Sequence, residues 1–148
     1  EIAAVDREDG RYGTADWNGD LHVVDPDDDR VVDLIGPASY AVDVAFADDD
    51  RLVSRHRDGS TYLWDIAARR LVGRLWRSTA FVSFGMEVDR AENDLVQATS
   101  EGIARISLDP ADWFETVCSR IDRRLTETEL AAIAPGLVPG PGCPGRPG

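Results

Sequence analysis

The residues of this chain that come closest to a chemical site are its clustered carboxylates. The runs at residues 25–29 (DPDDD) and 48–50 (DDD) each bring several aspartates together, and oxygen ligands of this kind suit Ca²⁺. The first run lacks the Gly at the sixth place and the acid at the twelfth place that an EF-hand loop requires. The second run occupies a different turn. We therefore expect solvated turn residues that keep sheet edges apart, and no metal site.

Hydrolytic chemistry needs a nucleophile beside a base, and the chain offers only His22 and His56 as imidazole bases. No Gly-x-Ser-x-Gly elbow is present, and neither Ser54 nor Ser60 has a histidine at a telling position. We expect His56 to play a polar role at the surface or between repeats, and His22 to pack between repeats. The glycine-rich stretch opens no helix and so makes no phosphate loop. The sequence predicts no catalytic residue and no cofactor.

Cys118 and Cys143 are the only cysteines, and with two histidines they give no spacing suited to zinc. Two interpretations stay open. The pair forms a disulfide if the domain is exported, or Cys118 is a small buried apolar group on a helix.

Composition and charge narrow the classes of partner. The 148 residues include 16 basic and 28 acidic side chains, for a net charge of −12, which repels nucleic-acid backbones and anionic lipid surfaces. No apolar run approaches the roughly 18 residues of a membrane helix. The first residue is Glu1, so we expect the beginning of the gene product to lie outside this sequence. We predict no nucleic-acid partner, no membrane span and a cytoplasmic location.

An internal repeat organises the first two thirds of the chain. Shifting the sequence by 40 places matches polar and apolar positions without a gap, and a weaker third copy follows after a further 43 places. A period of this length is typical of repeat architectures. The matched pairs are Asp9 with Asp49, Arg11 with Arg51, Gly19 with Gly59, Asp25 with Asp65, Arg30 with Arg70 and Val32 with Val72; in the third copy Leu95, Val96, Gly102 and Ile106 fall on Leu52, Val53, Gly59 and Leu63.

Within one period the pattern predicts four short strands separated by tight turns. In the second copy we expect strands at 42–47, 51–56, 61–66 and 71–75, with turns at 48–50, 58–59 and 67–70. The Asn18-Gly19 and Asp58-Gly59 pairs indicate type I′ hairpins. Large apolar residues are consecutive at 62–64 (YLW), so both faces of the sheet must be covered.

The chain changes character after Leu108. Asp109 and Pro110 are typical of a helix start, and apolar residues then recur at helical spacing through Leu125. Thr126 and Glu129 form a capping box for a second, short helix ending at Ala134. We expect residues 110–134 to be a helical extension and residues 135–148 to be an irregular Pro/Gly-rich tail.

The segment at residues 58–65 (DGSTYLWD) resembles the signature end of a WD40 repeat, and 48–52 (DDDRL) resembles the turn that precedes it. The resemblance covers about residues 1–109. It implies a buried hydrogen-bond network in which Trp64, Ser54 and Asp58 match the family positions. The His of the family's Gly-His pair is absent, since Gly36 and Pro37 stand near its place. Thr14, Asn18 and Val24 are the counterparts in the first copy, and Gln97, Glu101 and Ser107 in the third.

The resemblance implies an all-β fold: a partial WD40-like β-propeller of nearly three four-stranded antiparallel blades, followed by a short helical extension. The sequence, including its helical extension, resembles the carboxyl-terminal region of bacterial multidomain WD-repeat proteins. The implied function is a non-catalytic platform for protein partners, with further blades and an effector domain on the amino-terminal side. The alternative is part of a propeller hydrolase or lyase whose site lies in other blades. An uncovered blade face predicts poor solubility or self-association.

Overall fold

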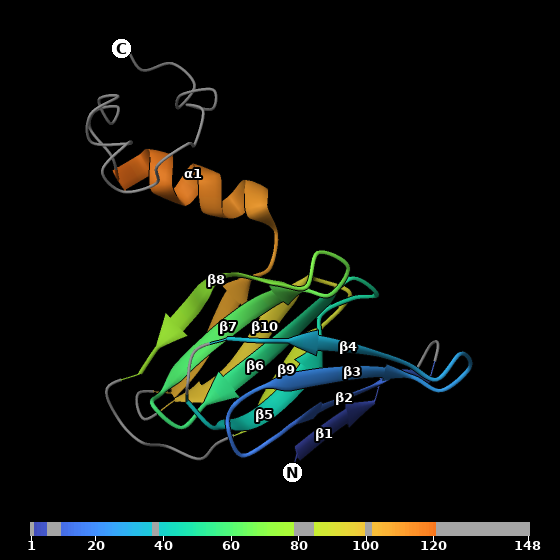
Figure 1. The fold of residues 1–148 in the computed structure, drawn as a ribbon. Coiled ribbons are helices and arrows are strands. Elements are labelled where there is room, and N and C mark those ends of the chain that lie inside the picture. The colour runs from blue at the N-terminus through green and yellow to red at the C-terminus, as the bar shows by residue number, and fades with distance from the viewer. Residues whose placement is uncertain (1, 6–9, 37–38, 79–84, 100–101, 121–148) are drawn as a thin grey trace, which may run out of the picture. The chain divides into compact units, whose positions relative to one another are not determined.

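The computed structural model describes residues 2–5, 10–36, 39–78, 85–99 and 102–120, which form mainly antiparallel β-sheet (Figure 1). The first sheet has the order β1-β2-β3-β4, the middle sheet β5-β6-β7-β8, and the third sheet β11-β10-β9. All pairings are antiparallel, and the all-β prediction is confirmed. The strands are β1 Ile2–Val5, β2 Tyr12–Ala15, β3 Leu21–Asp25, β4 Arg30–Leu34, β5 Ala41–Phe46, β6 Arg51–His56, β7 Ser60–Asp65, β8 Arg70–Arg77, β9 Met86–Asp89, β10 Asp94–Thr99 and β11 Gly102–Ser107.

The middle sheet follows the pattern of the sequence closely, because its strands are rich in β-branched and aromatic residues bounded by Asp and Gly. The predicted strand at 51–56 coincides with β6, and those at 42–47 and 61–66 lie one residue from β5 and β7. β8 runs longer than predicted and pairs with β7 through two register shifts. In β7 the consecutive residues Tyr62, Leu63 and Trp64 are all buried, so both faces of this strand are covered, as the sequence predicted.

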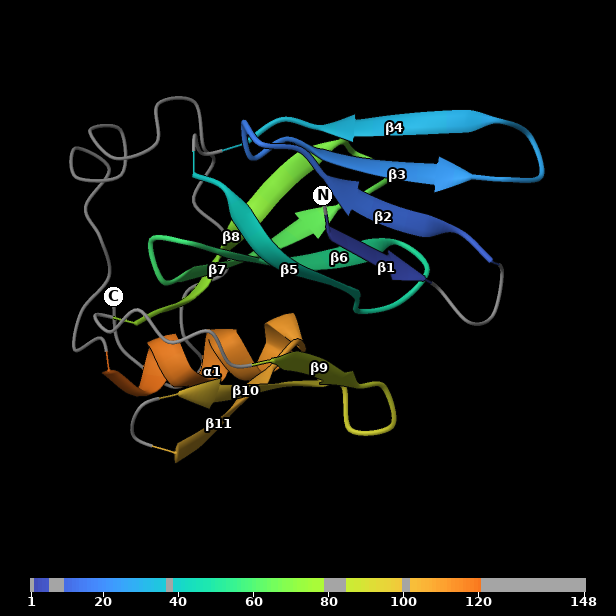
Figure 2. The ribbon, with the colours of Figure 1, turned by 90° about the horizontal axis from the view of Figure 1, so that it is seen from below.

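Contacts divide the chain into two compact units, residues 1–108 and 109–148. Within the first unit, β5 of the middle sheet contacts β1 and β2 of the first sheet and β9 of the third sheet, as Figure 2 lets the reader follow. The apolar core forms between the first and middle sheets. Its buried members are Ala15, Leu21, Val23, Val32, Leu34, Ala41, Val44, Phe46, Leu52, Tyr62, Trp64 and Ile66.

The hairpins at Gly19 and Gly59 differ from the predicted type I′ turns. A type I′ turn needs positive φ at both central residues, whereas only the glycines have it, at 93° and 83°. Each hairpin instead closes a longer loop, in which Gly19 N donates to Asp16 O (3.2 Å) and Gly59 N to His56 O (3.0 Å). This is the three-residue form with a left-handed glycine. The prediction of a hairpin was right and its turn type was wrong.

Backbone conformation recurs with the sequence period. Left-handed residues stand at Gly19, Gly59 and Gly102 and, between the last two strands of a sheet, at Asp29 (φ 54°) and Arg69 (φ 52°). Aspartates hold the latter turns, since Asp27 N donates to Asp25 Oδ1 (3.1 Å) and Ala68 N to Asp65 Oδ1 (2.8 Å). The first two copies therefore share turn geometry as well as strand order.

The third sheet departs from the predicted alignment by one residue. Ser54 pairs with Tyr62, eight positions on, but its counterpart Gln97 pairs with Ala104, only seven positions on. Because the hairpin is one residue shorter, Ile106 pairs with Leu95 as Trp64 pairs with Leu52. Ile106 therefore takes the place of Trp64, and the predicted equivalences of Ile106 with Leu63 and of Ser107 with Trp64 were wrong.

The second unit contains the helix α1 Pro110–Arg120. Asp109 caps it, since Ala111 N donates to Asp109 Oδ1 (2.8 Å), as the sequence predicted. The predicted helix at 126–134 and the tail at 135–148 lie outside the described residues. Among the described residues, no helix has the length and apolar character needed to cross a bilayer.

Candidate functional site

A chain of hydrogen bonds runs through the interior of the middle sheet. Trp64 Nε1 lies 2.7 Å from Ser54 Oγ, which lies 2.8 Å from His56 Nε2. The other ring nitrogen of His56, Nδ1, lies 2.5 Å from the carbonyl oxygen of Ser39, just before β5. Trp64, Ser54 and His56 are all buried. These hydrogen bonds therefore connect β7, β6 and the loop before β5 directly, through buried side chains.

Only one set of donors and acceptors satisfies this chain. The Ser39 carbonyl can only accept, so His56 Nδ1 carries a hydrogen, and the indole N–H can only donate, so Ser54 Oγ accepts from it. The Ser54 hydroxyl then donates to His56 Nε2. This arrangement requires a neutral imidazole, since a proton on Nε2 would leave the serine hydroxyl with two donors and no acceptor.

The predicted network residues are partly brought together. The structure joins Trp64 to Ser54, but Asp58 binds its own turn, accepting from Ser60 N (3.0 Å) and Ser60 Oγ (3.1 Å). His56 supplies the histidine that the sequence was thought to lack. The statement that Ser54 has no histidine at a telling position was wrong, and the period of a strand was the missed signal, because residues two apart share a face.

Ser54 and His56 have the atoms of a nucleophile and a base, but a substrate cannot reach them. Both side chains are buried, and the serine oxygen already accepts from the indole. A substrate carbonyl has no path to Ser54 Oγ without opening the sheet. The pair is therefore a structural element of the sheet.

Burial sets the titration of His56. Desolvation is the dominant cause and lowers its pKa below the ordinary value of 6.5, while the Ser39 carbonyl and the charge of Asp58 act in the opposite direction. At a pH between the two pKa values, His56 is protonated in the unfolded chain and neutral in the folded chain. The stabilisation from neutral His56 is present above pH 6.5 and is lost as the pH falls from that value toward the folded pKa.

We expect the free energy of unfolding to fall as the pH is lowered from about 7.5 to about 5.5, because His56 must be neutral in the folded state. Urea titrations followed by tryptophan fluorescence across this range measure the slope. His56→Gln removes the titrating group and is expected to flatten it. His22→Gln is the matched control, since it removes the other histidine and leaves the buried chain intact. A slope that survives in His56→Gln would contradict the assignment.

The prediction that His22 packs between repeats was wrong. Its side chain lies on an open face of the first sheet, where Nδ1 is 2.8 Å from Asp33 Oδ1. The register explains this, because His22 alternates with the buried residues Leu21 and Val23. The pair links β3 to β4 at the surface.

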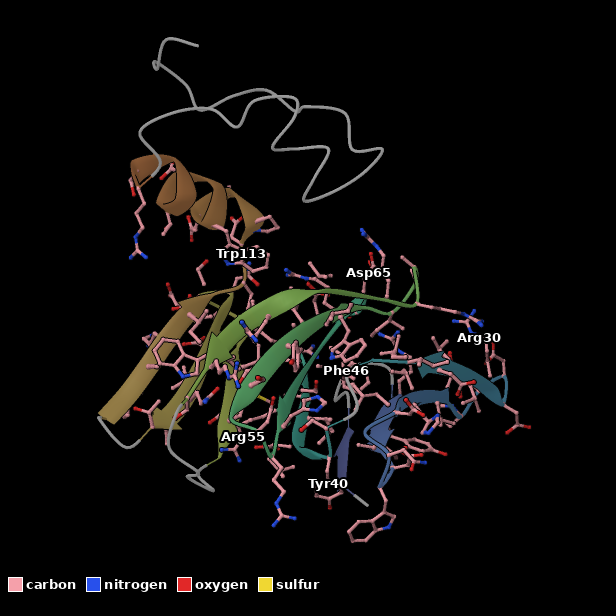
Figure 3. The ribbon with its side chains drawn as sticks, turned by 60° about the vertical axis from the view of Figure 1, so that its left-hand side comes forward. Arg30, Tyr40, Phe46, Arg55, Asp65 and Trp113 are labelled. Carbon is pink, nitrogen blue, oxygen red and sulfur yellow. The ribbon has the colours of Figure 1, made fainter. Side chains whose placement is uncertain are left out.

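An exposed tryptophan stacked on a half-buried tyrosine lies at the end of the sheets opposite to Asp65. Trp17 is 77% exposed and stacks on Tyr40 with ring centroids 5.2 Å apart and planes 14° apart. Figure 3 shows Tyr40 at this end. Arg57 N donates to Tyr40 O (2.8 Å), which brings the β6–β7 turn alongside. Loops from two sheets therefore present aromatic surface together.

The turn that carries Trp17 is held by one carboxylate. Asp16 Oδ1 accepts from Asn18 N (2.8 Å) and Asp20 N (3.1 Å), and Oδ2 accepts from Asn18 Nδ2 (3.2 Å). Desolvation acts to raise the pKa of Asp16, but these hydrogen bonds together lower it. The indole is therefore displayed on a preformed loop rather than on a loose one.

The opposite end of the sheets is charged and carries two clefts. One, of about 240 Å³, is lined by Arg11, Arg30, Arg69, Asp49 and Asp50 among others. The other, of about 460 Å³, includes Arg51, whose guanidinium reaches Asp48 Oδ2, Leu108 O and Asn93 Oδ1. Arg51 therefore links the β5–β6 turn to the third copy. In Figure 3, Arg30 and Asp65 lie toward this end.

The acidic runs hold their own turns. Asp28 Oδ1 accepts from Arg30 N (3.0 Å) and Asp48 Oδ1 from Asp50 N (3.0 Å). Within the described residues, no group of three or more His, Cys, Asp or Glu side chains is placed to hold a metal ion. Cys118 lies on α1, but its side chain and all of Cys143 lie outside what the structure describes, so both interpretations, a disulfide and a buried Cys118 thiol, stay open.

Comparison with known proteins gives a fold and no family. No family model matches the chain, and no curated protein is significantly similar to it. Among solved structures, the crystal structure of the computationally designed Ika4 protein has a TM-score of 0.59 at 19% identity. The match covers 72% of this chain and 65% of the designed protein. At this identity the likeness concerns the fold alone.

Proposed function

We propose that this chain is a non-catalytic protein-binding module, built as part of a WD40-like propeller in the scaffold or sensor region of a bacterial signalling protein. Two features support the propeller arrangement. The first two sheets repeat strand order and turn geometry with a period of 40 residues. The first strands β1, β5 and β9 also make successive contacts, as strands near a common axis would.

The stack of Trp17 on Tyr40 carries the binding proposal. A tryptophan that is 77% exposed on a loop fixed by Asp16 costs free energy in water that a partner recovers by covering it. Tryptophan and tyrosine dominate the binding energy of protein interfaces, because they offer large apolar area with little side-chain entropy to lose. The ligand class that fits is an exposed peptide segment with an apolar side chain to place on the indole.

Trp17→Ala is expected to weaken partner binding by about tenfold or more, as removal of a central aromatic anchor does. The partner is represented by peptides selected from a random displayed library against the intact chain, and affinities are measured by fluorescence polarisation. Trp76→Ala is the matched control, since Trp76 is also an exposed tryptophan but lies on β8. Equal binding to Trp17→Ala and the unaltered chain would contradict the proposal.

A further inference from the structure

The three sheets differ in how many of their faces are covered. We call the front face of each sheet the one that holds Tyr12, Leu52 and Leu95, and the back face the one that holds Gly13, Val53 and Val96; the two alternate along each strand. A Cβ on Gly13 would lie 3.3 Å from Leu52 Cδ1, so the back of the first sheet meets the front of the middle sheet. Thr61 Oγ1 donates to Gln97 Oε1 (2.8 Å), so the back of the middle sheet meets the front of the third.

The front face of the first sheet is open. Tyr12, Val24 and Val31 form one cross-strand row on it, and Val31 is 48% exposed. In the middle sheet the places of Tyr12 and Val24 are taken by Leu52 and Trp64, which are both fully buried. Tyr12 is 38% exposed, so its position is core in the middle sheet and surface in the first sheet. The next cross-strand row on the same face consists of Thr14, His22 and Asp33.

The back face of the third sheet is also open. Ala98 and Ile103 face each other across β10 and β11, and Ile103 is 76% exposed. The corresponding residues of the middle sheet, Arg55 and Thr61, are both buried. Ile103 is the second residue of β11, and at this exposure it is apolar surface without a cover among the described residues.

We infer that these two faces bind each other between copies of the chain: the back of the third sheet in one copy packs on the front of the first sheet in a second copy. The contact continues a packing geometry that the chain already uses twice, between its first and middle sheets and between its middle and third sheets. By equivalence with the Thr61–Gln97 contact, Ile103 of one copy lies against Thr14 of the other.

Charged side chains on the two faces are hydrogen-bonded within their own face. His22 pairs with Asp33 on the front face (2.8 Å), and Arg105 pairs with Asp94 (3.0 Å) and Asp89 (2.9 Å) on the back face. Each of these carboxylates has a hydrogen-bond partner within its own face, so none of them is left without a partner when the face is covered. Because the two faces differ, the contact is head to tail and builds rings or chains of copies.

The inference is independent of the proposed partner binding, since Trp17 and Tyr40 belong to neither face. Val31→Arg blocks the front face and Ile103→Arg blocks the back face. In sedimentation velocity over a range of concentrations, the unaltered chain is expected to associate and each variant alone to run as a monomer, with association weakened by about tenfold or more because an unpaired charge enters the contact.

The decisive measurement is a mixture of the two variants. Val31→Arg keeps an intact back face and Ile103→Arg an intact front face, so the mixture is expected to form a dimer of one copy of each and to stop there. Val72→Arg is the matched control, since Val72 is 43% exposed on the outer strand of the middle sheet, and it is expected to associate like the unaltered chain. Tyr12→Glu is a second front-face variant, so a folding defect of one variant does not decide the outcome.

Three results would overturn the inference. The first is an unaltered chain that stays monomeric, which would leave these faces to another part of the chain or to a different protein. The second is single variants that associate as strongly as the unaltered chain. The third is a mixture of folded variants that remains monomeric, because it would exclude the head-to-tail contact.

Discussion

Gly36→Ala is expected to lower the free energy of unfolding by about 2–3 kcal/mol, as overpacking of a filled core does. A Cβ at Gly36 would lie 2.0 Å from Trp64 Cη2, 2.9 Å from Cζ3 and 3.0 Å from Cζ2. The indole is fully buried and its nitrogen is fixed to Ser54, so the ring cannot swing aside. The φ of Gly36 is not in the left-handed region, so the cost arises from the clash and not from backbone strain.

Gly73→Ala is the matched control for this substitution. Gly73 also lies in the described β-region, and a Cβ there meets nothing within 4 Å, so stability is expected to change by no more than about 0.5 kcal/mol. Urea denaturation followed by circular dichroism measures both variants. A Gly36→Ala chain as stable as Gly73→Ala would contradict the close approach of Gly36 to the indole.

Trp64→Phe provides the rescue. Phenylalanine lacks the Cη2, Cζ2 and Cζ3 atoms that the alanine methyl would strike, so the double variant is expected to be more stable than the sum of the two single losses predicts. Residues in contact show coupling energies of about 0.5–3 kcal/mol in such cycles. Strict additivity would place the defect of Gly36→Ala somewhere other than at the indole.

Local patterns sufficed to predict the middle sheet. Turn residues at 48–50 and 58–59 bracket β6 on both sides, and a strand of β-branched and apolar residues between such turns has few alternatives. The helix start at Asp109 was predictable for the same reason, because a cap and a first-turn proline act within a few residues. Both predictions depend on neighbours in sequence.

Side-chain placement across sheets was less accessible. The register of β11 depends on a hairpin one residue shorter than its counterparts, and nothing in the pattern of residues 102–107 marks which face is covered, since Ile103 is exposed and Ile106 half-buried. The role of Gly36 was hidden because it is defined by a contact with Trp64, 28 positions on. The Ser54–His56 pair was accessible from strand periodicity, but the family pattern places its histidine in a Gly-His pair and not on the strand that carries the serine.

The network also explains why the resemblance at residues 58–65 predicted two of its members and missed a third. Trp64 and Ser54 meet because β6 and β7 are neighbours in one sheet, which any hairpin ensures. The pairing of β6 with β7 does not determine which segment supplies the histidine. Here it comes from β6 itself and anchors the loop before β5 through Ser39.

Ser54→Ala is expected to be among the most damaging single-atom changes in the chain, lowering the free energy of unfolding by about 2–5 kcal/mol. The serine oxygen serves two groups at once, accepting from Trp64 Nε1 and donating to His56 Nε2. Its removal leaves a buried donor and a buried acceptor without partners, and each such group costs about 1–3 kcal/mol. Water cannot replace the hydroxyl, because the residues around it are buried.

Ser60→Ala is the control that separates this effect from the loss of any buried hydroxyl. Ser60 is equally buried, but its Oγ makes a single hydrogen bond to Asp58, whose carboxylate also accepts from Ser60 N, so the expected loss is only about 1 kcal/mol. Ser54→Thr keeps the hydroxyl and is expected to recover part of the stability that Ser54→Ala loses. Equal losses for Ser54→Ala and Ser60→Ala in urea titrations would contradict the shared role of Ser54 Oγ. Because Ser54 Oγ is hydrogen-bonded to both the indole and the imidazole, its removal also breaks the hydrogen-bonded connection between β7 and the loop before β5.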